Sequence, residues 1–417
     1  MDKLQAMSAT ARILIGLVAG LLLGVALAAI DPPWRGAVTS GLDAVGGVWL
    51  DALRMTIIPL VFALLVTGVA QAAGALEAGG VAGRALILFG VLLVASAALG
   101  AVVADLILQA WPVPSAAAAA LRASAKGAGA VPPMPPLAEW LRGFVPDNPV
   151  KAAADGAMVP LVFFALVFGL AGARLEAPRR ATLFAFFDAV QAAMMVVVGW
   201  VLWVAPVGVA ALSLSFGART GVQGLGVLAQ YVAVVSLMCL SAGVLGLLAG
   251  MIGGGVRPGA LLGALIPVNA VAISTQSSLA CLPTLLQAAD RVGVRASIRD
   301  LVMPMAVALF RITSPAGNMA VAVYVAHIYG LHLDPARLVA GVLVAALVSV
   351  AAVGIASAVT FFTTLGPIFM AMGLPMELLP LFLAVETLPD LSRTLGNVAG
   401  HLGAAALLDR RSPRAEA

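Results

Sequence analysis

Between Arg84 and Asp105 the chain reads Ala85-Leu-Ile-Leu-Phe-Gly-Val-Leu-Leu-Val-Ala-Ser-Ala-Ala-Leu-Gly-Ala-Val-Val-Ala104, twenty residues without one charged side chain. The hydrocarbon core of a bilayer is about 30 Å thick, and a helix needs about 20 apolar residues to cross it. This stretch therefore predicts a transmembrane helix. The whole chain of 417 residues has the same character, with 62% hydrophobic residues, 10% charged residues and a mean hydropathy of +1.09. Such a composition indicates an all-α, multi-pass membrane protein and excludes a soluble globule and a disordered chain.

Further uncharged runs, bounded by charge or by Gly and Pro, predict eight membrane spans in all. They lie near 12–30, 43–72, 82–110, 151–173, 182–215, 225–252, 300–330 and 375–408. Residues 111–150 are rich in Pro, Ala and Gly, so we expect an aqueous loop with interfacial pieces there.

Two more apolar stretches, 257–291 and 336–372, are each interrupted by small polar residues. The first contains Ser274-Thr-Gln-Ser-Ser278, and the second runs from Ser349 to Ser357 around Gly354. Non-helical backbone at membrane depth is tolerated only where protein buries it or where it lines a cavity. We therefore expect two re-entrant helical hairpins, and such paired, interrupted segments point to a transporter's binding site.

The basic residues mark the ends of the predicted spans. Cytoplasmic ends of membrane segments carry an excess of Lys and Arg, so their distribution places both termini in the cytoplasm of a protein in the inner (plasma) membrane. The net charge of +4 is spread out and forms no dense patch, so no nucleic-acid partner is expected. The residues that cluster at alternate ends are Lys3, Arg12 and Arg84, then Arg174, Arg179 and Arg180, then Arg291, Arg295 and Arg299, then Arg410, Arg411 and Arg414.

The densest chemistry lies in the last predicted span, Glu386-Thr-Leu-Pro-Asp-Leu-Ser-Arg-Thr-Leu-Gly-Asn-Val-Ala-Gly-His401. At 100° per residue, five polar side chains fall within about 80° on one helix face. These are Glu386, Asp390, Arg393, Asn397 and His401. Ionisable groups at membrane depth face a polar interior and pair there. One interpretation is a structural ion-pair network, such as Asp390 with Arg393; the other is a site for a small organic ion, with hydroxyls from Ser277 and Ser278.

Several motifs, taken in order, resemble the dicarboxylate/amino acid:cation symporters, the glutamate transporter family. The resemblance covers nearly the whole chain. It rests on the serine-bearing hairpin that ends in Leu282-Pro283, on the Asp390–Arg393–Asn397 face, and on Leu53-Arg-Met-Thr-Ile-Ile-Pro-Leu-Val-Phe62, Val145-Pro-Asp-Asn-Pro149, Val159-Pro-Leu-Val-Phe-Phe-Ala165 and Ala205-Pro-Val-Gly-Val-Ala210.

The resemblance implies an inverted-repeat elevator transporter that works as a homotrimer in the lipid bilayer. A fixed scaffold would comprise 1–80 and 111–224, and a mobile transport domain would comprise 81–110 and 225–408, with 409–417 as a cytoplasmic tail. The hairpins would serve as gates.

The resemblance also implies roles for individual residues. Arg393 would hold the side-chain carboxylate of the substrate, Asp390 its amino group, and Asn397 with Thr394 its main-chain carboxylate. Further contacts would come from Ser277, Ser278, Ser314 and the backbone near Gly354.

One departure from the family pattern concerns the coupling ion. Where the family has Asn-Met-Asp-Gly-Thr, this chain has Phe310-Arg-Ile-Thr-Ser314, and His401 replaces an aspartate that ligates sodium. A hard cation needs several oxygen ligands, which these side chains do not supply, so we expect no metal site and weakened or absent sodium coupling. Arg311 could act as a tethered cation with Glu386 or Asp390 as its counter-charge, or it could snorkel or simply neutralise Glu386 without affecting coupling. Proton coupling through Glu386 or His401 stays open.

The substrate depends on the partner of Arg311. If Arg311 pairs with Asp390, two arginines could clamp a dicarboxylate without an amino group, such as succinate or fumarate. If it pairs with Glu386, an acidic amino acid (aspartate or glutamate) is favoured, and this is the slightly preferred interpretation. An uncoupled carrier, an anion channel or a substrate sensor on the same scaffold is the alternative.

An enzyme is not expected, because neither His-Glu-x-x-His nor Gly-x-Ser-x-Gly occurs in the chain. Cys239 and Cys281 lie in apolar stretches and are expected to be packing residues, and no cofactor is predicted.

Overall fold

The computed structural model describes residues 9–77, 80–124, 142, 145–351 and 357–411, and within these residues every regular element is a helix. Five helical stretches are long and apolar enough to cross a membrane: Gly80–Ala110, Ala177–Val201, Gly224–Gly253, Pro258–Thr275 and Ala296–Tyr329. Four shorter apolar helices accompany them: Ile15–Ile30, Met55–Gly68, Pro160–Ala173 and Pro335–Val350. The protein is thus a helical integral membrane protein, as its composition predicts.

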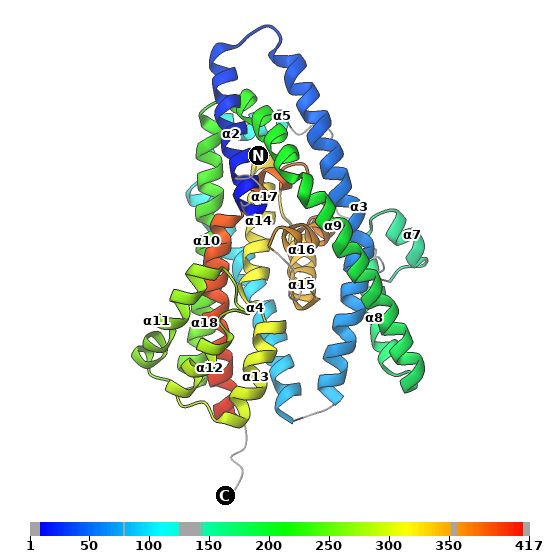
Figure 1. Cartoon of the computed structure of the whole chain (residues 1–417), viewed down its shortest axis with the longest axis vertical. Helices are drawn as coiled ribbons and strands as arrows, with labels where there is room; N and C mark the ends of the chain where they lie inside the picture. Colours follow the sequence, from blue (N-terminus) through cyan, green and yellow to red (C-terminus); the bar gives the residue numbers. More distant parts are fainter. Residues whose placement is uncertain (1–8, 78–79, 125–141, 143–144, 352–356, 412–417) are drawn as a thin grey trace, which may run out of the picture.

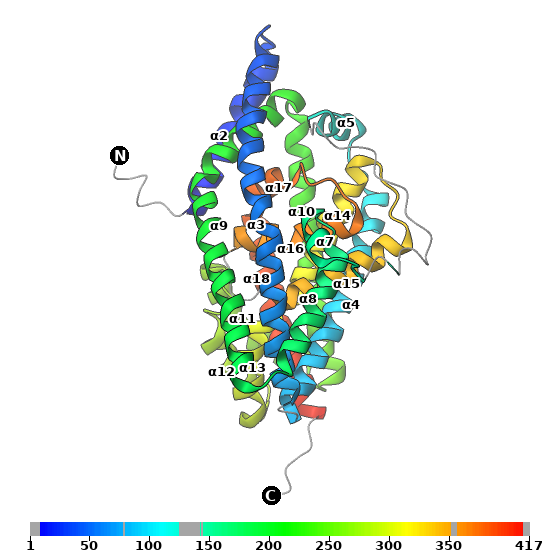
Figure 2. The ribbon, with the colours of Figure 1, turned by 90° about the vertical axis from the view of Figure 1, so that its right-hand side faces the viewer.

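The helices form an elongated bundle (Figures 1 and 2). In chain order they are α2 (Ala9–Ile30), α3 (Arg35–Glu77), α4 (Gly80–Ala110), α5 (Ser115–Ser124), α7 (Pro149–Ala154), α8 (Met158–Ala173), α9 (Ala177–Thr220), α10 (Gln223–Leu248) with the π-helical turn η1 (Ala249–Gly253), α11 (Pro258–Thr275), α12 (Leu282–Arg291), α13 (Ala296–Leu309), α14 (Thr313–Tyr329), α15 (Pro335–Ala351), α16 (Ser357–Met372), α17 (Leu379–Val385) and α18 (Thr387–Arg411).

Two groups of helices pack among themselves. In the first, α9 lies along both α2 and α3, and α8 packs against α3. In the second, α10 packs against α18 and α14, while α14 also packs against α4. This grouping is compatible with the predicted scaffold and transport domain, but α15 contacts members of both groups, so the domain boundaries stay a prediction.

The contact between α10 and α18 is made backbone to backbone. A Cβ atom on Gly243 would come within 2.7 Å of the Cα of Gly396, and one on Gly250 within 2.7 Å of the Cα of Gly403. Small residues at such positions let two membrane helices approach closely, so that dispersion contacts between backbones replace side-chain packing. This close approach brings the polar face of α18 against α10 and α14.

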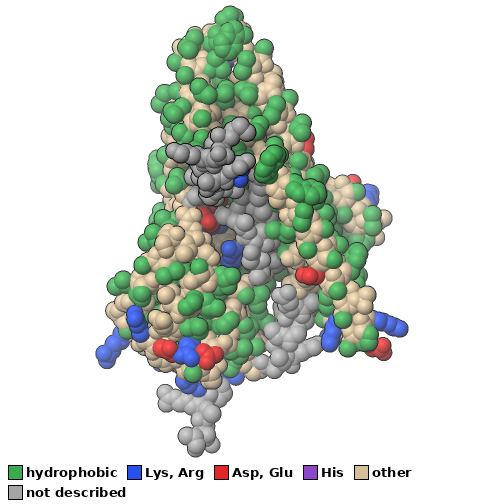
Figure 3. Space-filling view, viewed as in Figure 1, with side chains coloured by type: hydrophobic (Ala, Val, Ile, Leu, Met, Phe, Trp, Pro, Cys, Tyr) green, Lys and Arg blue, Asp and Glu red, His purple; other side chains and the backbone are tan. Residues whose placement is uncertain are grey.

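The outer surface is apolar over most of its length. In Figure 3 hydrophobic side chains cover much of the visible face, and charged side chains gather towards the lower end. On α9, Trp200 and Trp203 are 67% and 73% exposed. Such large apolar side chains are stable on a surface that faces lipid.

The first predicted hairpin is present. Helices α11 and α12 pack against each other, and α11 ends where Gln276 adopts a left-handed conformation, with φ of 50°. For the second hairpin, α15 packs against α16, while Gly354 and the rest of 352–356 lie outside the described residues. Both cysteines are buried and form no disulfide, as expected for packing residues.

Three of the predicted spans are not continuous helices, and the one near 151–173 divides into α7 and α8 at a turn after Ala154. The span near 300–330 divides into α13 and α14, with a break at Phe310 to Ile312, and Figure 1 shows α14 above α13. The span near 375–408 divides into α17 and α18 at Glu386. Arg311 therefore lies at a helix break and not inside a helix, and Glu386 precedes the helix that carries the other four polar residues. Apolarity predicts depth in the membrane but not helical continuity, because side chains of neighbouring helices can satisfy a broken backbone.

Candidate functional site

Arg393 of α18 is bound to Glu386, seven residues earlier in the chain. Arg393 Nε donates to Glu386 Oε1 over 2.8 Å, and Nη2 lies 2.7 Å from the same oxygen. The other carboxylate oxygen, Oε2, accepts a hydrogen bond of 3.0 Å from the hydroxyl of Tyr231 on α10. All three side chains are buried. A buried ion pair persists when both charges are hydrogen-bonded, and here each oxygen of the carboxylate has a donor.

The guanidinium of Arg393 also reaches α14. Nη1 donates to Asn318 Oδ1 over 3.2 Å, and a Cβ atom on Gly317 would come within 2.9 Å of Nη1. The absent side chain at Gly317 leaves the space that the guanidinium occupies. The sequence suggested Asp390 as the partner of Arg393. In the structure the hydrogen bonds of the Arg393 guanidinium go to Glu386 and Asn318 instead.

Arg311 and Asp390 complete the charged cluster. Both are half-buried, and Asp390 and Arg393 lie near enough to Arg311 to interact with it electrostatically. The cluster therefore holds two guanidinium groups and two carboxylates within one region of the bundle. At this site Arg311 has Asp390 as its neighbouring carboxylate, while Glu386 is occupied by Arg393.

Asn397 ties α18 to the first turn of α14. Its Oδ1 accepts hydrogen bonds from Thr313 N (3.1 Å) and Thr313 Oγ1 (2.9 Å). Thr313 Oγ1 also lies 3.2 Å from Arg393 O. The carbonyl of this amide therefore satisfies an otherwise orphaned donor at the start of a helix.

At the helix break, side chains of other helices satisfy the backbone carbonyls. His401 Nε2 is 2.8 Å from Phe310 O, and Ser96 of α4 donates to Ile312 O. Because a carbonyl can only accept, Nε2 carries the proton, and the buried Nδ1 has no hydrogen-bond partner among the described residues. The ring of Phe310 stacks on Phe89 with centroids 4.6 Å apart. Hydrogen bonds from other helices and aromatic packing thus stabilise the break between α13 and α14.

The remaining predicted residues lie at two places. Ser314 is buried in the first turn of α14, and Thr394 of α18 donates to Asp390 O over 3.1 Å. At the hairpin tip Ser277 accepts from Ala280 N over 3.3 Å, so its bonds are local. Among the described residues, no hydrogen bond joins Ser277 or Ser278 to the charged cluster, and Gly354 lies outside these residues.

Four contributors were missed from the sequence: Tyr231, Asn318, Thr313 and Ser96. Each is a polar residue in a predominantly apolar helix, and membrane helices hold such residues where they face protein and not lipid. That signal marks them as inward-facing, but only the packing of α4, α10 and α14 brings them to α18 and to the helix break before α14.

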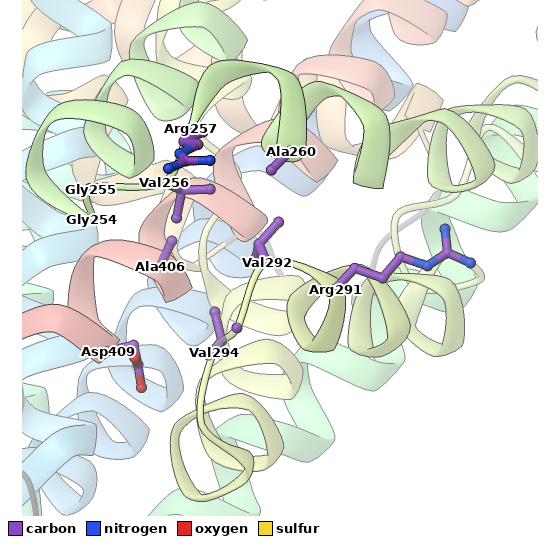
Figure 4. Close-up of a pocket in the computed structure, with 11 residues that line it drawn as sticks. Gly254, Gly255, Val256, Arg257, Ala260, Arg291, Val292, Val294, Ala406 and Asp409 are labelled. Carbon is purple, nitrogen blue, oxygen red and sulfur yellow. The ribbon is translucent and has the colours of Figure 1, made fainter.

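A separate cavity of about 280 Å³ lies near the end of α18 (Figure 4). It is lined by Arg257 at the start of α11, by the loop after α12, and by Ala406 and Asp409. Asp409 is 16 residues beyond Arg393, or about 24 Å along a helix, so this cavity is remote from the charged cluster.

Discontinuous helices that meet at a buried charged cluster, inside a lipid-facing bundle, define the class of secondary membrane transporters. The chain belongs to the sodium:dicarboxylate symporter family, whose model matches residues 9–411. It is therefore a transport protein and not an enzyme, and the resemblance inferred from its motifs is confirmed.

Relatives with different substrates in their names are similar over nearly the whole chain. The proton/glutamate-aspartate symporter of Escherichia coli (strain K12) is 28% identical over 398 residues, 94% of this chain and 90% of that protein. The neutral amino acid transporter B(0) of Oryctolagus cuniculus is 31% identical over 446 residues, 96% of this chain and 80% of that protein. The C4-dicarboxylate transport protein of Rhodospirillum rubrum is 28% identical over 406 residues, 94% and 85% respectively.

The helix break fits sodium poorly. The side chains of Phe310 and Ile312 are apolar and fully buried, and the carbonyl oxygens of both residues already accept hydrogen bonds. Among the described residues no group of three or more His, Cys, Asp or Glu side chains could hold a metal ion. A hard cation would find few free oxygen ligands there.

Proposed function

We propose that this protein is a secondary transporter that carries a C4-dicarboxylate or an acidic amino acid across the membrane. The observation that carries the proposal is the nearness of two guanidinium groups, Arg311 and Arg393, in a buried region of the bundle. Guanidinium binds carboxylate through paired, charge-assisted hydrogen bonds, and two such groups suit a dianion. Relatives named for glutamate, aspartate and C4-dicarboxylates support this substrate class.

Within this class, the neighbourhood of Arg311 favours a dicarboxylate without an amino group. Asp390 is the carboxylate that interacts electrostatically with Arg311, and this interaction makes Asp390 a weaker partner for a substrate ammonium. The slight preference for an amino acid that the sequence alone suggested is therefore reversed in the proposal.

Thermal-shift binding and uptake into proteoliposomes test this proposal. Succinate and fumarate should stabilise the protein more than aspartate and glutamate do, and should be taken up faster. Serine and alanine serve as neutral controls, because one relative is named as a neutral amino acid transporter. Stabilisation by the neutral amino acids alone would overturn the proposed substrate class.

For the coupling ion, we propose that uptake does not need sodium. The satisfied carbonyls at Phe310 and Ile312, with Arg311 between them, support this, because a fixed positive charge and two donors occupy the region where a cation would need oxygen ligands. Protons remain the other candidate. His401 could take a proton on Nδ1, which has no hydrogen-bond partner among the described residues, and keep its Nε2 bond to Phe310 O, whereas a proton on Glu386 would remove the negative charge that Arg393 pairs with.

Replacing external sodium by choline separates the cases. Uptake should persist in choline, and a collapse would show that the tethered-cation proposal is wrong. Accumulation against a concentration gradient under an imposed pH gradient would indicate proton coupling. Equilibration without accumulation would instead favour the uncoupled carrier or anion channel, and binding without flux would favour the sensor.

The proposal includes an elevator-like movement of the transport domain (81–110 and 225–408) relative to the scaffold (1–80 and 111–224). It also includes a homotrimer with both termini cytoplasmic in the inner membrane. The basic residues at the span ends and the sparse contacts between the two groups support this arrangement. Cross-linking and accessibility labelling of introduced cysteines at the two termini would test oligomeric state and orientation.

A further inference from the structure

We infer that Tyr231 on α10 is a positioning residue for Arg393. Through Glu386, it holds the guanidinium in one orientation and so determines how well Arg393 receives a substrate carboxylate. The inference rests on the proposed function in one respect, that Arg393 meets the substrate. Neither the family description nor the names of the relatives assigns a role to this tyrosine.

Tyr231 can position another group because its own ring is fixed. It is completely buried, and it stacks on Phe382 of α17 with centroids 4.2 Å apart and an interplanar angle of 7°. Tyr324 of α14 packs against it edge-on, with centroids 5.6 Å apart and an angle of 73°. With aromatic rings in contact from two other helices, the ring cannot turn freely, so the hydroxyl stays at one place.

The hydroxyl of Tyr231 donates the hydrogen bond that satisfies Glu386 Oε2. Both the Nε and the Nη2 contacts of Arg393 are made to the other oxygen, Oε1. Glu386 is only 3% exposed, so water is not at hand to replace the tyrosine hydroxyl. A buried carboxylate oxygen without a donor is unfavourable, so the carboxylate would rotate towards another donor. That rotation would disturb the two contacts that Oε1 makes with Arg393.

The orientation of Arg393 matters because its hydrogens are only partly used. Its contacts engage Nε, Nη1 and Nη2, but Nη1 and Nη2 each carry a second hydrogen. Glu386 and Asn318 direct the planar group, and thereby direct these remaining hydrogens. A guanidinium whose plane is held this way binds a carboxylate without losing further rotational freedom, which raises affinity.

Tyr231→Phe removes the hydroxyl and keeps the ring. Tyr324→Phe is the matched control, because Tyr324 is equally buried in the same aromatic cluster, but its hydroxyl donates to Val227 O over 2.8 Å and has no bond to Glu386. Both variants should lower the Tm. Only Tyr231→Phe should raise the KM for uptake of the preferred dianion, by at least fivefold, while the maximal rate changes less than the KM does.

A second measurement does not depend on the substrate. Phenylglyoxal modifies arginine side chains, and peptide mass spectrometry gives its rate at Arg393 in the full-length protein. We expect this rate to rise severalfold in Tyr231→Phe and to stay unchanged in Tyr324→Phe.

The results that overturn the inference are distinct from those that overturn the proposed function. An unchanged KM and an unchanged modification rate in Tyr231→Phe, with a lowered Tm, would reduce Tyr231 to a packing residue. Equal rises in both variants would assign the effect to the aromatic cluster as a whole. If the wild-type protein takes up no dianion, the proposed function fails, and the modification rate at Arg393 still decides the role of Tyr231.

Discussion

Ser96→Ala tests whether side-chain donors hold the broken helix together. The hydroxyl of Ser96 on α4 donates to the carbonyl of Ile312, and both residues are fully buried. Alanine leaves that carbonyl without its donor in a place that water does not reach. A buried polar group that loses its partner destabilises a protein by about 1–3 kcal/mol. Since 1.4 kcal/mol is a factor of ten, the population of unfolded or locally opened protein should rise roughly 5- to 150-fold.

The assay is thermal unfolding of the purified protein in detergent, with Ser241→Ala as the control. Ser241 on α10 donates over 2.8 Å to Leu237 O of its own helix and faces outward. Its loss should change stability by less than about 0.5 kcal/mol. We expect a Tm several degrees lower for Ser96→Ala and an almost unchanged Tm for Ser241→Ala. Equal Tm values for the two variants would refute the view that Ser96 satisfies the break.

Two further substitutions test the helix contact and the charged cluster. Gly403→Ala should destabilise the protein by about 1–3 kcal/mol, because the new Cβ would overlap the carbonyl oxygen of Gly246. Gly47→Ala is the control: a Cβ there meets no other atom, so the change should be neutral or stabilising by up to about 1 kcal/mol. A comparison of the Tm values of the two variants checks this prediction. Arg311→Gln should weaken binding of the preferred dicarboxylate by about tenfold or more, since a charge-assisted hydrogen bond contributes about 1.5–3 kcal/mol. Titration calorimetry measures this affinity. An unchanged affinity would show that Arg311 does not contact the substrate.

The apolar helices were predictable because apolarity is a local property of the chain. The first hairpin was predictable for a related reason, since Ser274 to Ser278 interrupts an apolar stretch with five polar residues. The breaks at Phe310 to Ile312 and at Glu386 were missed, although a local signal existed. Pro315 lies in the first turn of α14 and Pro389 in the first turn of α18, and proline is favoured at helix starts. Both prolines lie inside predicted spans, and a proline within a membrane helix does not by itself require a break.

The charged cluster was predicted in part. Helical periodicity correctly placed Asp390, Arg393, Asn397 and His401 together on α18, since the angle between side chains depends only on spacing. It could not predict that Arg393 would bind Glu386, because that choice depends on the break at Glu386 and on Tyr231 from another helix. Nor could it predict that His401 would face Phe310, because the approach of α18 to the break between α13 and α14 depends on how closely α10 and α18 pack.

The amino-acid sequence by itself determined the membrane character and the family of this protein, together with the small set of charged residues within its apolar segments. These follow from composition, spacing and motifs, which act over a few residues. Only the tertiary structure decided which charged side chains pair with each other. A buried charge takes the partner with the best geometry and the fewest unsatisfied hydrogen bonds, and that partner comes from wherever the packed backbones bring it. For Arg393 those partners are Glu386, Asn318 and, through Glu386, Tyr231.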